Sequence, residues 1–429
     1  MVTKVLQKTF RIIPTVVLLY LSSCVPLGTV PTHTVSKTLE YMDRNYEAYI
    51  GNVILNSNNP FQKLGSTQSL NLEFDIFSNK LENLQVRYIH CNADWTKSKI
   101  QEIEYLRSFN QFDYSSFEYS TNTKINYVQY FFELDRPFLS GNYLIVVHRR
   151  DNKDDILLTR RMVFYEERVS VNSRIRVSSI VKDRQTHQQI DFEMNYGAIQ
   201  APNPQRDFKI LILQNKNWTA ALKNLTPTNV QPSQNKMEWN LFTGENTFPG
   251  WNQFRYLDLR TLNLRGINVA KIDKETSPWS VYQGLDKSSG GGSYRGLIID
   301  NNGRILPGNS DPGESWLEAD YADVHFTMKS ERLAGRVYVT GRFNDWRRDD
   351  HNIMQYDKTN QVYHTTIRLK QGYYDYMYFV DSPELSAYTL EGSHFQTENE
   401  YDILVYYRAP GEINDEVVGF FSMNSVDFF

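Results

Sequence analysis

Short runs of alternating apolar and polar residues recur in the first third of the chain. Residues 72–76 and 84–88 place an apolar side chain at every second position, and an apolar run at 143–147 follows a Ser-Gly-Asn turn. Successive side chains of a strand point to opposite faces, so these runs predict β-strands. Together they predict an N-terminal β-sandwich over residues 41–167.

The strand pattern restarts near residue 169. Residues 208–213 and 254–259 read as strands, residues 216–223 have the pattern of a short helix, and Asn302-Gly303 suits a hairpin turn. These features predict a central β domain over residues 168–318.

A third group of alternating runs closes the chain. Apolar side chains recur at every second position in residues 324–328, 374–378 and 403–405, which predicts a C-terminal immunoglobulin-like sandwich over residues 319–429. Aromatic residues make up 14% of the sequence, with 28 Tyr and 24 Phe, and this enrichment also favours strands. We therefore expect an all-β fold of tandem immunoglobulin-like/E-set β-sandwich domains in series.

The N-terminus has the features of a bacterial export signal. Lys4, Lys8 and Arg11 precede the apolar run 12–20, which is too short to span a bilayer as a helix. The run ends in Leu-Ser-Ser-Cys24, which resembles a lipobox, so we expect a signal peptide over residues 1–23 and lipidation of Cys24.

Residues 24–40 would then be a flexible tether. The stretch that follows Cys24 holds no acidic run, which favours the periplasm and attachment to the inner leaflet of the outer membrane as a lipoprotein. With Cys24 lipidated, Cys91 is left without a disulfide partner within the chain.

Charge and motif content argue against several functions. Loss of residues 1–23 removes three basic and no acidic residues, which moves the net charge from −4 to −7, so no nucleic acid partner is expected. The eight histidines lack metal-ligand spacing, and Asp300 to Gly303 fits a plain turn better than a calcium loop. His90 and Cys91 would point to opposite faces of a strand, so they predict packing and not a nucleophilic pair.

The sequence therefore predicts a non-enzymatic protein with no cofactor, no metal site and no small-molecule substrate. One short motif has a ligand-binding precedent. Gly341-Arg-Phe343-Asn344-Asp-Trp346, followed by the strand at 367–381, resembles the glycogen-binding and isoamylase N-terminal immunoglobulin-like modules. In such modules a second tryptophan usually completes the sugar platform, and Trp346 is the last tryptophan of this chain.

Two interpretations of this motif stay open. Phe343, Asn344 and Trp346 could contact a glycan or a partner, which would make the chain a periplasmic glycan-binding lipoprotein. Alternatively, Phe343 fills the core, Asn344 bonds the turn backbone and Trp346 covers the edge of the sandwich.

Several longer strings together resemble the plug protein family of the type IX secretion system. The strings that carry this resemblance are His90-Cys91-Asn-Ala-Asp94-Trp95, Glu104-Tyr-Leu106, Ser120-Thr-Asn-Thr123, Ser140-Gly141-Asn142-Tyr143, Leu257-Asp-Leu-Arg-Thr-Leu-Asn263 and Glu391-Gly392-Ser-His-Phe-Gln-Thr-Glu398-Asn399-Glu-Tyr401. We expect these residues to have structural roles. The resemblance implies a periplasmic gate subunit that seals the inner mouth of a giant outer-membrane translocon β-barrel when no cargo is in transit, with that barrel as its partner.

Overall fold

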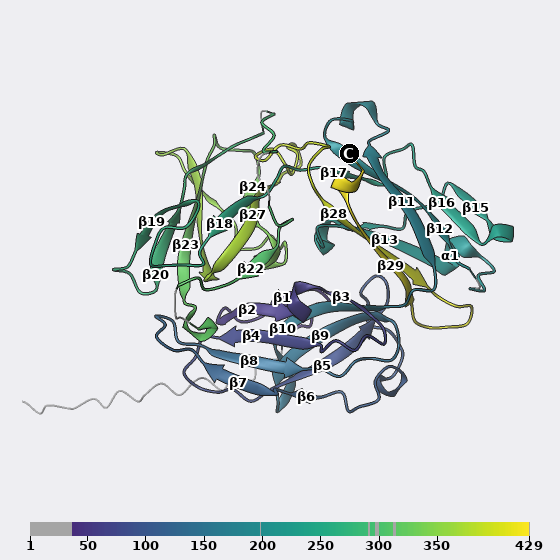
Figure 1. Cartoon of the computed structure of the whole chain (residues 1–429), viewed down its shortest axis with the longest axis horizontal. Helices are drawn as coiled ribbons and strands as arrows, with labels where there is room; N and C mark the ends of the chain where they lie inside the picture. The colour runs from purple at the N-terminus through teal and green to yellow at the C-terminus, as the bar shows by residue number, and fades with distance from the viewer. Residues whose placement is uncertain (1–36, 198, 291, 297–299, 312–314, 429) are drawn as a thin grey trace, which may run out of the picture. The chain divides into compact units, whose positions relative to one another are not determined.

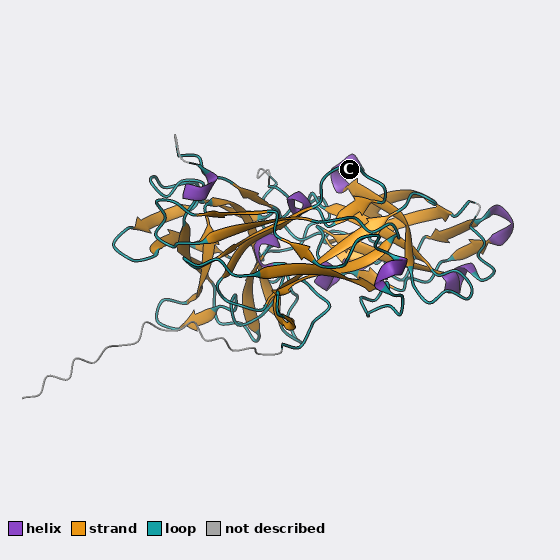
Figure 2. Cartoon of the chain, turned by 90° about the horizontal axis from the view of Figure 1, so that it is seen from below, coloured by secondary structure: helices purple, strands orange, loops and turns teal. Residues whose placement is uncertain are grey.

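Among the described residues, strands make up nearly all the regular structure and the helices are single turns (Figure 2). The computed structural model describes residues 37–197, 199–290, 292–296, 300–311 and 315–428. The predicted signal peptide, Cys24 and the rest of the predicted tether up to residue 36 lie outside these residues. Residues 37–40, predicted as part of that tether, are fixed instead, because Lys37 pairs with Asp155 at 3.0 Å and Leu39 packs against the cluster that holds Phe61 and Trp95.

The first sandwich packs two sheets around one apolar core. One sheet has the strand order β1-β10-β9-β5-β6 with β3 paired to β10, and the other has the order β2-β4-β8-β7. The strands are β1 (Arg44–Asn45), β2 (Ile50–Leu55), β3 (Phe61–Lys63), β4 (Asn71–Ile76), β5 (Leu84–Cys91), β6 (Phe112–Asp113), β7 (Ser116–Tyr119), β8 (Val128–Glu133), β9 (Gly141–Arg149) and β10 (Asn152–Tyr165). The alternating residues of β4 and β5 fill the core, as the sequence predicts.

The second sandwich is assembled from two separate stretches of chain. Its sheets have the orders β11-β12-β16-β15, with β17 paired to β12, and β14-β13-β28-β29. The strands are β11 (Ser170–Val177), β12 (His187–Asn195), β13 (Phe208–Gln214), β14 (Leu222–Lys223), β15 (Asn229–Gln231), β16 (Lys236–Trp239), β17 (Thr247–Pro249), β28 (Glu400–Tyr407) and β29 (Glu416–Asn424). Figure 1 shows β28 and β29, in yellow, beside the teal β13.

This pairing corrects the predicted extent of the C-terminal sandwich. The sequence predicts that residues 403–405 belong to a domain over 319–429, but Ile403 pairs with Ile212 and Val405 with Ile210 of β13. Their side chains belong to the core of the second sandwich. Alternation identifies a strand, yet it carries no information about which sheet the strand joins, and this explains the difference.

The third sandwich lies between β17 and β28 in the sequence. Its sheets have the order β18-β27-β22, with β24 paired to β27, and the order β19-β20-β23-β26-β25, with β21 paired to β23. The strands are β18 (Arg255–Asp258), β19 (Val269–Asp273), β20 (Trp279–Gln283), β21 (Asp286–Lys287), β22 (Ile305–Pro307), β23 (Tyr321–Lys329), β24 (Arg336–Thr340), β25 (Gln355–Asp357), β26 (Val362–Lys370) and β27 (Gly372–Asp381). The strand predicted at 254–259 thus serves this sandwich and not the predicted central domain over 168–318.

The described helices are short and lie in connections between strands. They are α1 (Pro204–Asp207) and the 3-10 turns η1 (Asn56–Asn58), η2 (Glu102–Glu104), η3 (Val181–Asp183), η4 (Trp218–Ala220), η5 (Pro232–Gln234), η6 (Trp316–Glu318), η7 (Arg342–Asn344) and η8 (Ser425–Asp427). The helix predicted at 216–223 is only the single turn η4, because Leu222 and Lys223 pair with β13.

The all-β prediction of tandem β-sandwiches is confirmed, with one change of connectivity. The third sandwich is inserted into the second, so the chain crosses between them twice, after β17 and before β28. Residues 36–429 form a single compact unit.

A buried ion pair links the first sandwich to the third. Asp75 of β4 and Lys370 of β26 lie 2.8 Å apart, with side chains 0% and 1% exposed. The hydroxyl of Tyr321 donates to the same carboxylate oxygen at 2.6 Å. The ammonium also lies 4.2 Å from the ring centres of both Tyr127 and Trp316, so aromatic faces replace much of the water it has lost.

Substitutions in this pair should show strong coupling. We expect Asp75→Ala or Lys370→Met alone to destabilise the protein by about 3–5 kcal/mol, because each leaves a buried charge uncompensated. The double variant should lose clearly less than the two single losses combined. A double-mutant cycle in urea measures this coupling.

The exposed pair Arg336 and Asp381, 3.0 Å apart on β24 and β27, is the matched control. Its coupling should be about 0–1 kcal/mol. Additive losses at Asp75 and Lys370 would show that the buried pair does not hold the two sandwiches together.

Candidate functional site

The His90–Trp95 motif forms a tight turn at the end of β5. The backbone N–H of Trp95 donates to the Asn92 carbonyl at 2.9 Å, and Trp95 has a positive φ of 67°. The Asp94 carboxylate accepts from the backbone N–H and the hydroxyl of Thr96, at 3.0 and 2.6 Å. Asp94 therefore fixes the turn through a local side-chain cap, as short acidic side chains do in turns.

This turn docks on the second sandwich through a buried carboxylate. Asp415 accepts from the backbone N–H of Ala93 at 3.0 Å, from Arg408 at 2.8 Å and from Lys209 at 3.1 Å. Burial alone would raise the pKa of Asp415, but its bonds to Arg408 and the Ala93 N–H hold that pKa below its ordinary value. The carboxylate thus stays ionised and ties the turn to both basic side chains.

The Gly141-Asn142-Tyr143 motif lies beside the same turn. Asn142 donates to the Asn92 carbonyl and accepts from the Tyr406 hydroxyl of β28, both at 3.0 Å. Gly141 has a φ of +156°, and a Cβ there would come within 2.3 Å of the His90 ring. Glycine is therefore required for His90 and the backbone of β9 to pack so closely.

His90 and Cys91 point to different clusters, as predicted. His90 packs against the rings of Tyr105 and Tyr143, and its Nδ1 lies 2.8 Å from the Ser98 hydroxyl. Burial lowers its pKa to about 4 and raises that of the Cys91 thiol to about 12. Neither group has the charge state or the geometry that nucleophilic catalysis requires.

Apolar side chains complete the joint between the first and second sandwiches. Cys91, Trp95 and Phe61 pack in one cluster with Trp218 and Leu404. The rings of Trp95 and Trp218 meet edge to face at 5.2 Å, a favoured geometry for buried aromatic pairs. This joint buries hydrophobic surface, whereas the joint of the first and third sandwiches centres on a charge pair.

Asn399 and Tyr401 hold the point where the chain returns from the third sandwich to the second. The Asn399 amide donates to the Gly250 carbonyl at 2.8 Å and to Gln188 at 3.1 Å, and it accepts from Asn215 at 2.8 Å. The Tyr401 hydroxyl donates to the same oxygen of Gln188 at 2.5 Å. The buried Asn399 amide thus joins the end of β17, the start of β28 and β12.

Glu391 organises the neighbouring part of this crossing. Its carboxylate, 1% exposed, accepts from Arg255 at 3.0 Å, Arg295 at 2.9 Å and the backbone N–H of Tyr378 at 2.8 Å. Burial opposes ionisation, but the two guanidinium groups hold its pKa below the ordinary value. Gly392 follows with a φ of +78°.

Glu398 receives a hydrogen bond from Asn424 at 2.7 Å. The motif segment 391–401 is therefore bonded to both sandwiches that it connects.

The Gly341–Trp346 motif forms the turn after β24. Asn344 accepts from the backbone N–H of Gly341 at 3.1 Å and donates to the Val339 carbonyl at 2.9 Å. Trp346 is 6% exposed and packs with Phe254, Met377 and Trp251. Phe343 is half-buried against the core of the third sandwich. The indole thus offers no open face on which a sugar ring could stack.

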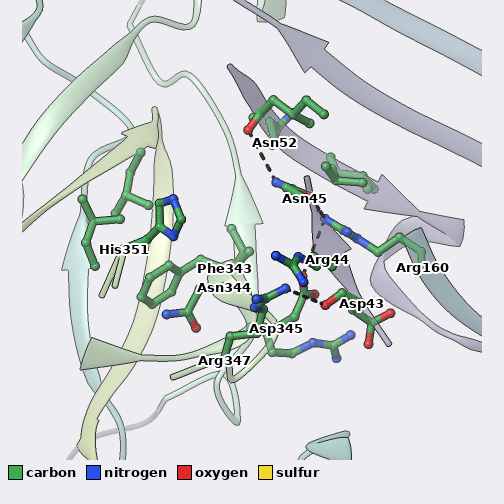
Figure 3. Close-up of a pocket in the computed structure, with 18 of the residues that line it drawn as sticks. Asp43, Arg44, Asn45, Asn52, Arg160, Phe343, Asn344, Asp345, Arg347 and His351 are labelled. Carbon is green, nitrogen blue, oxygen red and sulfur yellow. Dashed lines mark hydrogen bonds and ion pairs between the residues drawn. The ribbon is translucent and has the colours of Figure 1, made fainter. Parts of the chain in front are cut away.

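A cavity of about 460 Å³ lies between this turn and the first sandwich. Figure 3 shows Asp43, Arg44 and Asn45 beside Asp345 and Arg347, and Arg347 donates to the Asp43 carbonyl at 3.4 Å. Arg342 donates to the Asn58 carbonyl at 2.6 Å, and Arg160 lies 3.6 Å from Asp345. The motif is therefore a contact point for the first sandwich.

Two carboxyl groups fix the loop beneath Trp346. Asp375 accepts from the backbone N–H groups of Asn301 and Gly303 at 2.6 and 3.2 Å, and Asp300 accepts from Asn302 at 3.0 Å. Burial raises the pKa of Asp375 to about 7 and that of Asp300 to about 6. Within the described residues, no group of three His, Cys, Asp or Glu side chains could hold a metal ion.

The residues that join the first and third sandwiches carry no signal in the sequence that marks them as a joint. Asp75 occupies an ordinary polar position of an alternating strand, and Lys370 sits at a strand end, so neither shows any sign of burial in the sequence. The sequence also gives no sign of the roles of Asp415 and of the two arginines that bind Glu391.

A helix that is long and apolar enough to cross a membrane is absent from the residues described.

The fold and these joints define a class of protein made of interlocked β-sandwiches, in which the distinctive residues bind sandwiches to one another. Residues 37–166 match the family model described as type 9 secretion system plug protein 1st domain. Residues 324–397 match the glycogen recognition site of AMP-activated protein kinase. Both resemblances expected from the sequence are confirmed, and the region that resembles a plug protein first domain coincides with the first sandwich.

A solved structure extends the likeness over most of the chain. The crystal structure of a hypothetical protein from Parabacteroides merdae ATCC 43184 is 27% identical, with a TM-score of 0.84. The match covers 90% of this chain and 100% of that one. No curated protein matches.

The raised pKa of Asp375 predicts a specific pH dependence of stability. The folded protein holds this proton more tightly than the unfolded chain, so the contribution of Asp375 favours folding below about pH 4 and is lost as the pH rises to about 7. Asp375→Asn keeps an oxygen that can accept both backbone bonds but removes the titration. Its stability relative to wild type should therefore rise with pH across this window, by an amount on the order of 3 kcal/mol.

Urea unfolding of both proteins at pH 4.5, 6 and 8 checks this expectation, and these values bracket the titration that the pKa defines. Asp300 titrates in both proteins and largely cancels in the comparison. A constant difference between the two curves would show that Asp375 has an ordinary pKa.

Proposed function

We propose that the chain is a periplasmic gate subunit of the type IX secretion translocon, which seals the periplasmic mouth of the outer-membrane barrel between cargo passages. The observation that carries the proposal is the match of residues 37–166 to the plug protein first domain. A barrel that passes folded proteins needs a closure against leakage of small solutes. The gate needs shape and a partner surface but no reactive group.

The joints support this role because a stopper must keep its shape. Several motif residues that carry the family resemblance lie at contacts between sandwiches. Examples are Asn142, Asn399 and the turn whose Ala93 N–H donates to Asp415. Apolar packing, buried hydrogen bonds and buried ion pairs all cross these contacts. Such cross-links raise the free energy needed to separate one sandwich from another.

We place the protein at the inner leaflet of the outer membrane through lipidation of Cys24. Residues 24–36 would act as a tether that raises the concentration of the gate near its barrel. A gate that leaves and returns gains from this tether, because rebinding becomes a local event.

Glycan binding receives less support. The module match at 324–397 shows what the third sandwich resembles, but Trp346 is buried in this chain. Neither matched family is catalytic. These matches support the proposal that the protein is not an enzyme.

Affinity purification from detergent-solubilised outer membranes tests the proposal. We expect the tagged full chain, expressed at its native level, to co-purify a large outer-membrane β-barrel. Recovery from such membranes without any large barrel protein would contradict the proposed function.

Cys24→Ala is the matched variant for the tether. It should leave the binding surface intact but shift the protein into the soluble periplasmic fraction and reduce barrel recovery. If membrane attachment and recovery match those of the wild type, Cys24 is not the anchor, while the gate function itself still stands.

A further inference from the structure

The cavity between the first and third sandwiches is lined by an excess of basic side chains. Eight Lys and Arg residues and four Asp and Glu residues line it. A volume of about 460 Å³ lies within the range of sites that take small molecules, about 300–1,000 Å³. How much of this positive charge a ligand would meet depends on the carboxylate partners of these side chains.

Most of the basic side chains already have a carboxylate partner within 4 Å. The seven pairs are Arg44 with Glu40, Arg160 with Asp345, Arg161 with Asp43, Lys216 with Glu400, Arg347 with Asp349, Arg368 with Asp323 and Lys370 with Asp75. Arg342 has no such partner among the described residues. It is the cation of the cavity that remains available to a ligand.

The surroundings of Arg342 make its charge costly to leave unpaired. Burial lowers the pKa of its guanidinium, and the more distant Asp345 offsets this effect only in part. The side chain is bonded to one protein acceptor, the Asn58 carbonyl at 2.6 Å. A guanidinium offers five N–H groups in a planar fork that suits carboxylate and phosphate oxygens.

Two further donors lining the cavity lack acceptors. The Nε of Arg44 and the amide nitrogen of Asn52 are both buried, with no hydrogen-bond partner in the described part of the chain. Both residues belong to the first sandwich. Figure 3 shows Asn52 away from the turn that carries Asp345 and Arg44 close to it. Buried donors without acceptors are uncommon and cost free energy. A ligand oxygen that accepts from these two donors would remove that cost.

We propose that this cavity binds a small oxygen-rich anion, a carboxylate or phosphate compound, with Arg342 as the anchoring cation and Asn52 and Arg44 as donors from the first sandwich. The ligand would contact the first and third sandwiches at once. It would therefore add a contact between two bodies that already meet at the Asp75 and Lys370 pair and at the turn that carries Arg342. This site is independent of the proposed gate function, because it follows from the cavity alone.

Isothermal titration of the purified full chain with citrate and, separately, with inorganic phosphate tests the proposal. We expect saturable binding of at least one anion, with a dissociation constant below about 10 mM. Preference for citrate would identify a carboxylate ligand, and preference for phosphate a phosphate ligand. Absence of saturable binding by both anions would overturn the proposal.

Variants separate a specific site from general attraction to positive charge. Arg342→Gln should weaken binding about ten-fold or more, because a charge-assisted bidentate contact is lost. Arg336→Gln, which changes an exposed arginine of β24 outside the cavity, should leave binding unchanged. Equal losses in both variants would show that the anion binds nonspecifically.

Asn52→Asp provides a second test that does not depend on Arg342. Asn52 has a φ of 45°, a conformation that Asp tolerates, so the fold should be retained. The added carboxylate would repel an anion, and binding should fall about ten-fold. Unchanged affinity in this variant would exclude the cavity as the binding site.

Discussion

The attachment of the third sandwich to the first depends on a charge pair that has been withdrawn from water. Removing a carboxylate and an ammonium from solvent costs several kcal/mol for each ion. The pairing of Asp75 and Lys370 recovers part of this cost, and burial still raises the pKa of Asp75 and lowers that of Lys370. Their oxygen and nitrogen are 2.8 Å apart, and aromatic rings surround the ammonium. Gly51 keeps this contact close, since a Cβ there would come within 2.6 Å of the Tyr321 hydroxyl.

The three joints between the sandwiches differ in chemistry. The difference affects how firmly each joint fixes the arrangement of two separate cores. The first and second sandwiches share an apolar cluster, while the second and third are linked by two chain crossings with the buried side chains of Glu391 and Asn399 between them. Buried polar contacts require specific partners, so they favour one arrangement of the sandwiches over sliding alternatives. This specificity explains why the distinctive motifs of the sequence lie at joints.

The sequence predicted the strands well but not their partners. Residues 72–76 and 324–328 alternate clearly because one face of each strand fills a core. By contrast, Ile403 and Val405 alternate equally well in either sandwich, and only the long-range pairing with β13 decides between them. The insertion of the third sandwich into the second therefore could not be seen. Asp75 was hidden for a related reason, since burial of the polar face of β4 comes from another sandwich.

The local geometry of the motifs could be predicted from the sequence, but their contacts with distant residues could not. His90 and Cys91 point to opposite faces as strand geometry requires, and Asn344 bonds its own turn. The sequence could not show that Trp346 is buried against a loop held by Asp375. It also could not show that the turn of Trp346 contacts the first sandwich. Those facts depend on contacts between residues that are distant in the chain.

Differential scanning calorimetry of the full chain tests most directly whether the joints bind the three sandwiches into one body. Independent sandwiches would unfold in separate steps, as multidomain proteins usually do. If the joints act as described, heating should give one transition whose calorimetric enthalpy equals its van't Hoff enthalpy. Two or three resolved transitions would contradict the central claim that the joints unite the sandwiches.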